Sequence, residues 1–135
     1  MANSELRRYV LLEHTMNDGV HFDLMLDIAD DEKLRTIQLV TRMHEHDQTC
    51  AAKEIDAHRR DYLDYEGSVS NGRGHVRRVE RGRFGRDPDT PIRWLTLLPE
   101  GAAPYQLHFD SPISVARFHQ PPLPPALQAW LKKPS

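Results

Sequence analysis

The stretch EHTMNDGVHFDLML, from Glu13 to Leu26, contains the clearest structural signal in the sequence. From Val20 to Ile28 every second residue is apolar, which predicts a β-strand because successive side chains of a strand point to opposite faces. One face would carry Val20, Phe22, Leu24, Leu26 and Ile28, and the other would carry His21, Asp23, Met25 and Asp27. We expect the apolar face to pack in a core and the other face to present an imidazole, a carboxylate and a thioether in a row.

Further short strands are predicted on both sides of this segment, separated by turns rich in glycine, serine, proline and charged residues. They cover residues 9–13, 34–42, 75–79, 91–98, 105–109 and 114–118. Residues 43–53 indicate either a loop or a short helix, and residues 80–82 indicate a turn. Residues 123–133 predict a short C-terminal helix, because prolines precede it and lysines fall in its last turn. This pattern favours an all-β fold, either a barrel or a sandwich.

The length and composition of the chain are typical of one small domain. Its 135 residues can bury a core without stabilising cross-links. We expect residues 1–120 to form that domain, and the proline-rich residues 121–135 to lead into the short helix, packed on the domain or extending as a tail. The single cysteine, Cys50, excludes an internal disulfide and fits a reducing compartment. Neither a signal-peptide pattern nor a membrane-spanning apolar run is present, so we expect a soluble cytoplasmic protein without a membrane partner.

Charge is distributed unevenly along the chain, although the formal net charge is only −2. Seven of the fourteen arginines fall between residues 73 and 93, where few acidic residues oppose them. Such a cluster indicates either a surface for phosphate groups or a solvated face of a sheet. The sequence alone leaves both interpretations open.

Three segments contain polar residues that could form a metal or catalytic site. They are His14, the pair His21 and Asp23, and residues 57–67 with the sequence AHRRDYLDYEG. Imidazole and carboxylate ligands with open coordination positions suit a divalent transition metal that also binds substrate. Each residue taken singly has another explanation, because a lone histidine is more often a surface or core residue and Tyr62 would usually be a packing residue.

Two ordered motifs resemble the 3'-phosphoesterase domain of bacterial DNA ligase D and its small stand-alone relatives. EHTMNDGVHFDLML is similar to the family's E-H followed by H-[YFW]-D-[FL]-R-L, and HRRDYLDYEG is similar to its H-x-x-x-Y-x-D-[FY]-E-G. The resemblance covers residues 9–84, more than half of the chain. It implies a small β-barrel with short helical or 3-10 segments. It also implies a metal-dependent hydrolase that trims 3' ends of nucleic acid, first removing a terminal ribonucleoside and then the 3'-phosphate.

The resemblance also implies a role for each motif residue. The metal ligands would be His14, Asp23 and His58, and the divalent metal would be manganese, with zinc or another transition metal as alternatives. His21 would be the catalytic histidine that contacts the scissile phosphate or protonates the leaving group, and Tyr62 would contact the phosphate. The partners would be nucleic-acid 3' ends in DNA end repair, together with a separate DNA ligase or polymerase.

The sequence departs from the family's motifs at two arginine positions. The arginine that follows the family's aspartate by two residues is replaced by Met25, and a thioether cannot bind phosphate as a guanidinium does. A second family arginine corresponds to a position near Cys50. Three nearby arginines could supply a phosphate contact instead or could simply face solvent: Arg59, Arg60 and Arg73.

These departures leave three functions open. The first is a metal-dependent phosphoesterase acting on nucleic-acid 3' ends, which the retained histidines and Asp23 favour. The second is a non-catalytic metal-binding module that recognises nucleic-acid ends, which Met25 favours. The third is a phosphoesterase for a different phosphate substrate, since the groups that bind phosphate would determine which substrate is accepted.

Overall fold

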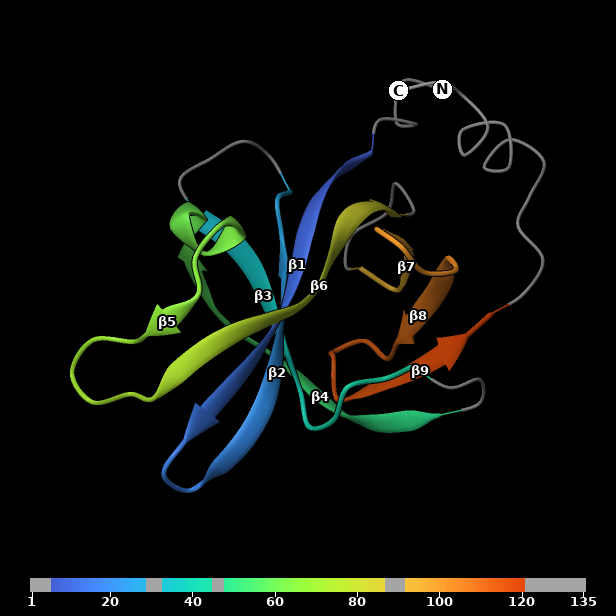
Figure 1. The fold of residues 1–135 in the computed structure, drawn as a ribbon. Coiled ribbons are helices and arrows are strands. Elements are labelled where there is room, and N and C mark those ends of the chain that lie inside the picture. The colour runs from blue at the N-terminus through green and yellow to red at the C-terminus, as the bar shows by residue number, and fades with distance from the viewer. Residues whose placement is uncertain (1–5, 29–32, 45–47, 87–91, 121–135) are drawn as a thin grey trace.

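A computed structural model describes residues 6–28, 33–44, 48–86 and 92–120, and 64% of these residues lie in antiparallel strands (Figure 1). The strands are β1 (Arg7–Met16), β2 (Gly19–Leu26), β3 (Lys33–Leu39), β4 (Thr49–Arg59), β5 (Gly67–Ser68), β6 (His75–Arg86), β7 (Trp94–Pro99), β8 (Tyr105–Phe109) and β9 (Val115–His119). One short 3-10 helix, η2 (Arg60–Leu63), directly follows β4.

Eight of these strands close into a barrel, because β1 pairs with β2 on one side and with β6 on the other. The order around the barrel is β1-β2-β3-β4-β9-β8-β7-β6, and the two-residue strand β5 is added outside on β6. Every pairing is antiparallel. The predicted all-β fold is therefore confirmed as a small barrel, and the predicted 3-10 segment is present.

The barrel interior is filled by apolar side chains from all eight strands. Leu24 and Leu26 on β2 belong to this core, as their alternation predicted, whereas Val20 at the hairpin end of β2 is 49% exposed. The fully buried members with the largest side chains include Tyr9, Leu11, Ile37, Leu39, Ile92, Leu95 and Phe109. One face of β1 and β2 is therefore fixed inward by the burial of this core.

A second apolar cluster lies on the outer face of the same barrel wall. It comprises Val10, Leu12, Met25, Leu34, Leu63 and Val76, with Tyr62 and Val69 packed against it. Residues 60–76, which contain η2 and β5, supply half of these side chains and cover this wall (Figure 1). The second face of β2 is consequently buried as well, and the exposed fractions of Asp23 and Met25 are only 2% and 1%.

Two sequence expectations for this part of the chain differ from the structure. Residues 49–53, which the sequence left as loop or helix, begin the long strand β4. The turn predicted at residues 80–82 is wrong, because β6 continues through it from His75 to Arg86. The irregularity there is a register shift between Leu11 and Leu12 on β1, a β-bulge that bends β6 without ending it.

The remaining expectations concern the ends of the chain. Residues 121–135, with the predicted C-terminal helix, lie outside the described residues. Within the part of the chain that the structure describes, no helix is long and apolar enough to cross a membrane.

Candidate metal centre

The first three candidate residues come from the β1–β2 hairpin. His14 on β1 lies directly opposite His21 on β2, and Asp23 follows two residues later on the same face. Cross-strand partners and their diagonal neighbours are close enough for side chains to touch. The spacing on the predicted strand placed His21 and Asp23 on one face, and the hairpin register adds His14 to them.

The ligand atoms of these three residues converge on one point. His14 Nδ1 lies 3.1 Å from His21 Nε2 and 3.6 Å from Asp23 Oδ2, and His21 Nε2 lies 3.3 Å from Asp23 Oδ1. Ligand atoms bonded to one ion at about 2.1 Å are separated by about 3.0 Å in octahedral and about 3.4 Å in tetrahedral geometry. The separation of the two histidine nitrogens is in this range, whereas the two distances to Asp23 involve different oxygens. One ligand atom from each residue lies within 4.8 Å of the other two, so this group, with half-buried histidines and a buried carboxylate, could hold a metal ion.

The tautomer of His14 is set by a backbone carbonyl. His14 Nε2 donates a hydrogen bond to the carbonyl oxygen of Arg73 at 2.7 Å, so Nδ1 carries the lone pair and faces His21 and Asp23. The turn that bears Arg73 approaches β1 closely, because a Cβ added to Gly74 would lie 1.9 Å from the carbonyl oxygen of Thr15. A carbonyl that orients an imidazole from behind is a common second partner of metal-binding histidines.

Asp23 carries a buried oxygen atom that has no hydrogen-bond partner within the described residues. This atom, Oδ1, lies near His21 Nε2 but outside hydrogen-bond geometry. Burial raises the pKa of Asp23 above its ordinary value, and the positive charges that His21, His14 and His58 can carry act in the opposite direction. Buried carboxylates are normally hydrogen-bonded, paired with a cation or bound to a metal. A cation between these side chains would satisfy the orphaned oxygen, so the residues present fit a metal ion.

His58 reaches the same cavity from the end of β4. Its Nδ1 lies 2.9 Å from the carbonyl oxygen of Asp56 and 3.1 Å from Thr36 Oγ1. A carbonyl oxygen can only accept, so Nδ1 carries the proton and Nε2 keeps a lone pair that could bind a cation. His58 is not one of the three residues whose ligand atoms converge. Within the described residues, the group of close ligand atoms is therefore His14, His21 and Asp23, and the predicted ligand role of His58 stays a prediction that its place in the cavity lining allows.

His14, Asp23 and His58 line a small cavity of about 80 Å³ between the barrel wall and the covering segment, and we name it the metal cavity. The lining comprises His14, Asp23, Met25, His58, Tyr62, Val69, Arg73 and Val76. Met25 thus occupies the wall of the cavity itself, and its side chain contributes no charge there. The structure brings together four of the five residues predicted from the two motifs in this lining, and the fifth, His21, contacts His14.

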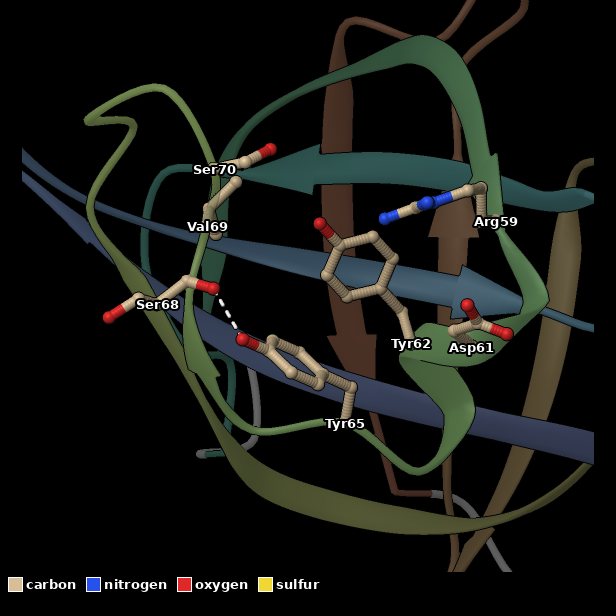
Figure 2. A pocket seen from close by; sticks show the side chains of 7 residues that line it. All are labelled: Arg59, Asp61, Tyr62, Tyr65, Ser68, Val69 and Ser70. Carbon is tan, nitrogen blue, oxygen red and sulfur yellow. Dashed lines mark hydrogen bonds between the residues drawn. The ribbon is translucent and has the colours of Figure 1, made fainter.

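A larger cavity of about 250 Å³ adjoins the first one (Figure 2). It is lined by Arg59, Asp61, Tyr62, Tyr65, Ser68, Val69 and Ser70, so Tyr62 and Val69 belong to both cavities. The Tyr62 ring makes edge-to-face contacts with His58 at 5.7 Å and with Tyr65 at 5.8 Å between ring centroids. Tyr62 therefore forms the partition between the metal cavity and this second cavity.

The three arginines proposed from the sequence have different environments. Arg60 donates two hydrogen bonds to the carboxylate of Asp27, at 2.6 and 3.0 Å, which ties η2 to the end of β2. The guanidinium of Arg73 is hydrogen-bonded to Ser70, to its carbonyl oxygen at 2.9 Å and to its hydroxyl at 3.2 Å. Arg59 is exposed and lines the second cavity.

Sequence reasoning missed the groups that position the histidines. The Arg73 carbonyl that orients His14 is a backbone group, and no side-chain motif can identify it. Thr36 lies on β3, and only the strand register places it beside His58. The glycines of the SNGRG turn indicated a tight turn, but not its contact with Thr15.

No protein-family model and no curated protein sequence matches the chain. The candidate centre therefore rests on the geometry of its own side chains and on the two motifs in which they occur.

Proposed function

We propose that this protein is a metal-dependent phosphoesterase that trims the 3' ends of nucleic acid in DNA end repair, with manganese as its metal. The observation that carries this proposal is the convergence of His14, His21 and Asp23 around an unsatisfied buried carboxylate oxygen. The resemblance of the motifs to the 3'-phosphoesterase domain of DNA ligase D supplies the substrate class. A bound divalent ion would neutralise phosphate charge and lower the pKa of a coordinated water.

We assign His14 and Asp23 as ligands in this proposal, with His58 as the third ligand and His21 as the catalytic residue. The two hydrogen-bond partners of His58 Nδ1 support the choice of His58. Its Nδ1 proton is held by Asp56 and Thr36, which leaves Nε2 free for the cavity, and this arrangement is typical of ligating histidines. The competing set has His21 as its third ligand. It is favoured by the short distances from His21 Nε2 to His14 Nδ1 and to Asp23 Oδ1.

Three side chains near the metal would then have separate roles in hydrolysis. His21, protonated at Nε2, would donate that proton to the 3' oxygen as its bond to phosphorus breaks and the bond from a water oxygen forms, and the proton lost by the attacking water would leave on the released phosphate or pass to solvent. Asp23 Oδ1 lies 3.3 Å from this nitrogen. Tyr62 would contact the phosphate from the partition between the two cavities and help to hold it in place.

A second candidate function follows from Met25. Its side chain is buried in the wall of the metal cavity, where a phosphate-binding cation would be useful to an enzyme. A site that binds a metal but lacks such a cation could recognise nucleic-acid ends without hydrolysing them. The same lack could equally reflect a different phosphate substrate.

An end-trimming assay tests the proposed function. Protein and Mn²⁺ are incubated with a primer–template whose primer ends in a 3'-phosphate, and with another whose primer ends in one ribonucleotide. We expect phosphate release or primer shortening by the wild type, and loss of product in both His21→Ala and Asp23→Ala. A wild type that binds Mn²⁺ but forms no product from either substrate would refute the proposed function and favour the non-catalytic module or another substrate.

A further inference from the structure

The cavity beside the metal cavity has the chemistry of a nucleotide subsite. Figure 2 shows Arg59 extending over the cavity next to Tyr62, with Tyr65 and the two serines on the other sides. Aromatic rings provide surfaces against which nucleobases and sugars pack, and hydroxyl groups can hydrogen-bond to sugar oxygens. At about 250 Å³, the cavity is below the usual range of about 300–1,000 Å³ for whole small-molecule ligands, so it suits one terminal nucleotide rather than a long segment.

Arg59 is the cation available for a ligand in this region. Its side chain makes no hydrogen bond or ion pair with any residue that the structure describes. Arg60 and Arg73, by contrast, are held by Asp27 and Ser70. A guanidinium whose donors are free can bind a phosphate with two parallel hydrogen bonds. Arg59 can therefore bind a phosphate in this way, whereas donors of Arg60 and Arg73 already bond to Asp27 and Ser70.

The position of Arg59 also compensates for the uncharged wall of the metal cavity. Met25 occupies that wall, and the guanidinium of Arg73 is turned to Ser70. Tyr62 lines both cavities, so a phosphate beside Tyr62 can be reached from the metal cavity and from the second cavity. Asp61 is a negative group in the same lining, and its carboxylate can accept from a sugar hydroxyl or base amine but repels phosphate.

We propose that this second cavity binds the terminal nucleotide of a nucleic-acid 3' end, with Arg59 contacting its phosphate and Tyr62 and Tyr65 packing against its nucleoside. Arg59 is then a specificity-determining residue of the proposed enzyme. The rigid wall of this subsite is Tyr65, whose hydroxyl donates to the carbonyl oxygen of Ser68. The inference rests on the proposed function, because the metal cavity would hold the reacting end of the same substrate.

The test measures binding of a short fluorescent single strand by anisotropy. The probe ends in a 3'-phosphate, and a second probe of the same sequence ends in a 3'-hydroxyl. Wild type, Arg59→Gln, Arg59→Lys and Arg83→Gln are compared in EDTA, which stops any metal-dependent turnover, and again with Mn²⁺. Arg83→Gln is the matched control, because Arg83 is exposed and lines a separate cavity on the other part of β6.

We expect the wild type to prefer the 3'-phosphate probe, and Arg59→Gln to weaken binding of that probe about tenfold or more, since a charge-assisted hydrogen bond is lost. Arg59→Lys should be intermediate, Arg83→Gln should change binding less than about twofold, and Mn²⁺ affinity should be the same in all variants. If Arg59→Gln and Arg83→Gln behave alike, or if the wild type shows no preference, the subsite is overturned.

The binding experiment, combined with the end-trimming assay run on the wild type and Arg59→Gln, separates this inference from the proposed function. If the wild type binds no Mn²⁺ and releases no phosphate, yet Arg59→Gln still abolishes its preference for the 3'-phosphate probe, the phosphoesterase function fails and the subsite stands. If Mn²⁺-dependent trimming occurs with an unchanged KM in Arg59→Gln, the function stands and the role of Arg59 fails.

Discussion

Asp23 is the residue on which the candidate centre depends most directly. Asp23 is 2% exposed, and one of its oxygens has no hydrogen-bond partner among the residues that the structure describes, which is unfavourable for a carboxylate unless a cation is present. Its position on the same face as His21 could be predicted from the alternation of β2. Its burial could not, because the residues that cover it come from a segment more than thirty-five positions later in the chain. Function and folding thus compete at this residue, since the metal site requires a carboxylate where the fold alone would favour an apolar side chain.

The two histidines that compete for the third ligand position can be distinguished by substitution. We expect His58→Ala to lower Mn²⁺ affinity about tenfold or more, because a ligand nitrogen is lost. We expect His21→Ala to leave Mn²⁺ affinity within about threefold, an effect no larger than that of a lost neighbouring contact, while abolishing phosphate release. Titration calorimetry measures the affinity, and a 3'-phosphorylated primer reports the turnover.

His44→Ala is a suitable control for both variants, because His44 hydrogen-bonds to the backbone of Arg42 and does not line the metal cavity. The reverse pattern, with affinity lost in His21→Ala and kept in His58→Ala, would contradict our assignment. It would establish His14, His21 and Asp23 as the ligand set.

At the scale of elements, the segment with η2 and β5 packs on the outer barrel wall and encloses the metal cavity against it. Ion pairs fasten it to the wall, with Arg60 on Asp27 and Arg8 on Asp64 at 2.8 Å. The latter pair is exposed and contributes little by itself. Burial of the apolar side chains Leu63 and Val76 supplies most of the free energy that holds the segment on the wall. This segment carries Tyr62 and Arg73 to the cavity, so its docking determines whether the site is complete.

Gly74 lies in the turn of this segment that contacts His14, one of the proposed ligands. Its φ is +82°, and an added Cβ would lie 1.9 Å from the carbonyl oxygen of Thr15. Gly74→Ala should therefore displace the turn and break the hydrogen bond between His14 Nε2 and the carbonyl oxygen of Arg73. We expect a loss of unfolding free energy of about 1–3 kcal/mol and a weaker Mn²⁺ affinity. Chemical denaturation and titration calorimetry measure the two effects.

Gly72→Ala is the matched control for this variant. Gly72 has a similar φ of +68°, but an added Cβ would meet no atom within 4 Å. It should therefore show the cost of the backbone conformation without the effect on the metal. Equal Mn²⁺ affinities in Gly74→Ala and wild type would show that the Arg73 carbonyl does not orient His14.

The strands could be predicted where side chains alternate clearly, and β8 was predicted at its observed bounds, Tyr105–Phe109. The sequence did not predict β4, because its exposed residues include Lys53, Glu54 and Asp56, and only Ala52 is fully buried. The pairing of β1 with β6, which closes the barrel, joins residues about seventy positions apart and leaves no local pattern. The site residues could be named from their motifs, but their orientation depends on these long-range pairings.

At the scale of the whole molecule, a polar network centred on Glu80 crosses the barrel interior. Glu80 Oε2 accepts hydrogen bonds from the hydroxyls of Tyr9 and Tyr105, both at 2.6 Å, and Arg42 lies 3.5 Å from Glu80 Oε1. Burial raises the pKa of both tyrosines well above their ordinary value of 10.0, and the negative charge of Glu80 raises it further. This network joins β1, β6 and β8 across the barrel.

The raised pKa values predict loss of stability in alkali. Between the ordinary pKa of 10.0 and the raised values, the unfolded chain loses the two phenolic protons while the folded barrel keeps them, so folding stability falls as pH rises above about 10. The expected slope is about 1.4 kcal/mol per pH unit for each tyrosine, or about 2.7 for both. Urea denaturation at several pH values from 8 upward measures this slope.

Tyr9→Phe removes one of the two groups and should halve the slope, while also destabilising the fold at neutral pH by about 1–3 kcal/mol through a lost hydrogen bond to Glu80. A slope that is unchanged in this variant, or phenolate absorbance from Tyr9 and Tyr105 appearing near pH 10 in the folded protein, would contradict the proposed burial of the network.

Titration of Mn²⁺ into the purified protein, followed by calorimetry, tests the central claim most directly. The proposed function predicts one Mn²⁺ per chain for the wild type and an affinity about tenfold or more lower for Asp23→Asn, because a neutral amide oxygen is a much poorer ligand than a carboxylate. The charge change can be controlled with Asp61→Asn, which removes an exposed carboxylate from the neighbouring cavity. If the wild type binds no Mn²⁺ or other divalent transition metal, or if Asp23→Asn and Asp61→Asn bind it alike, Asp23 is not a metal ligand and the proposed metal centre is refuted.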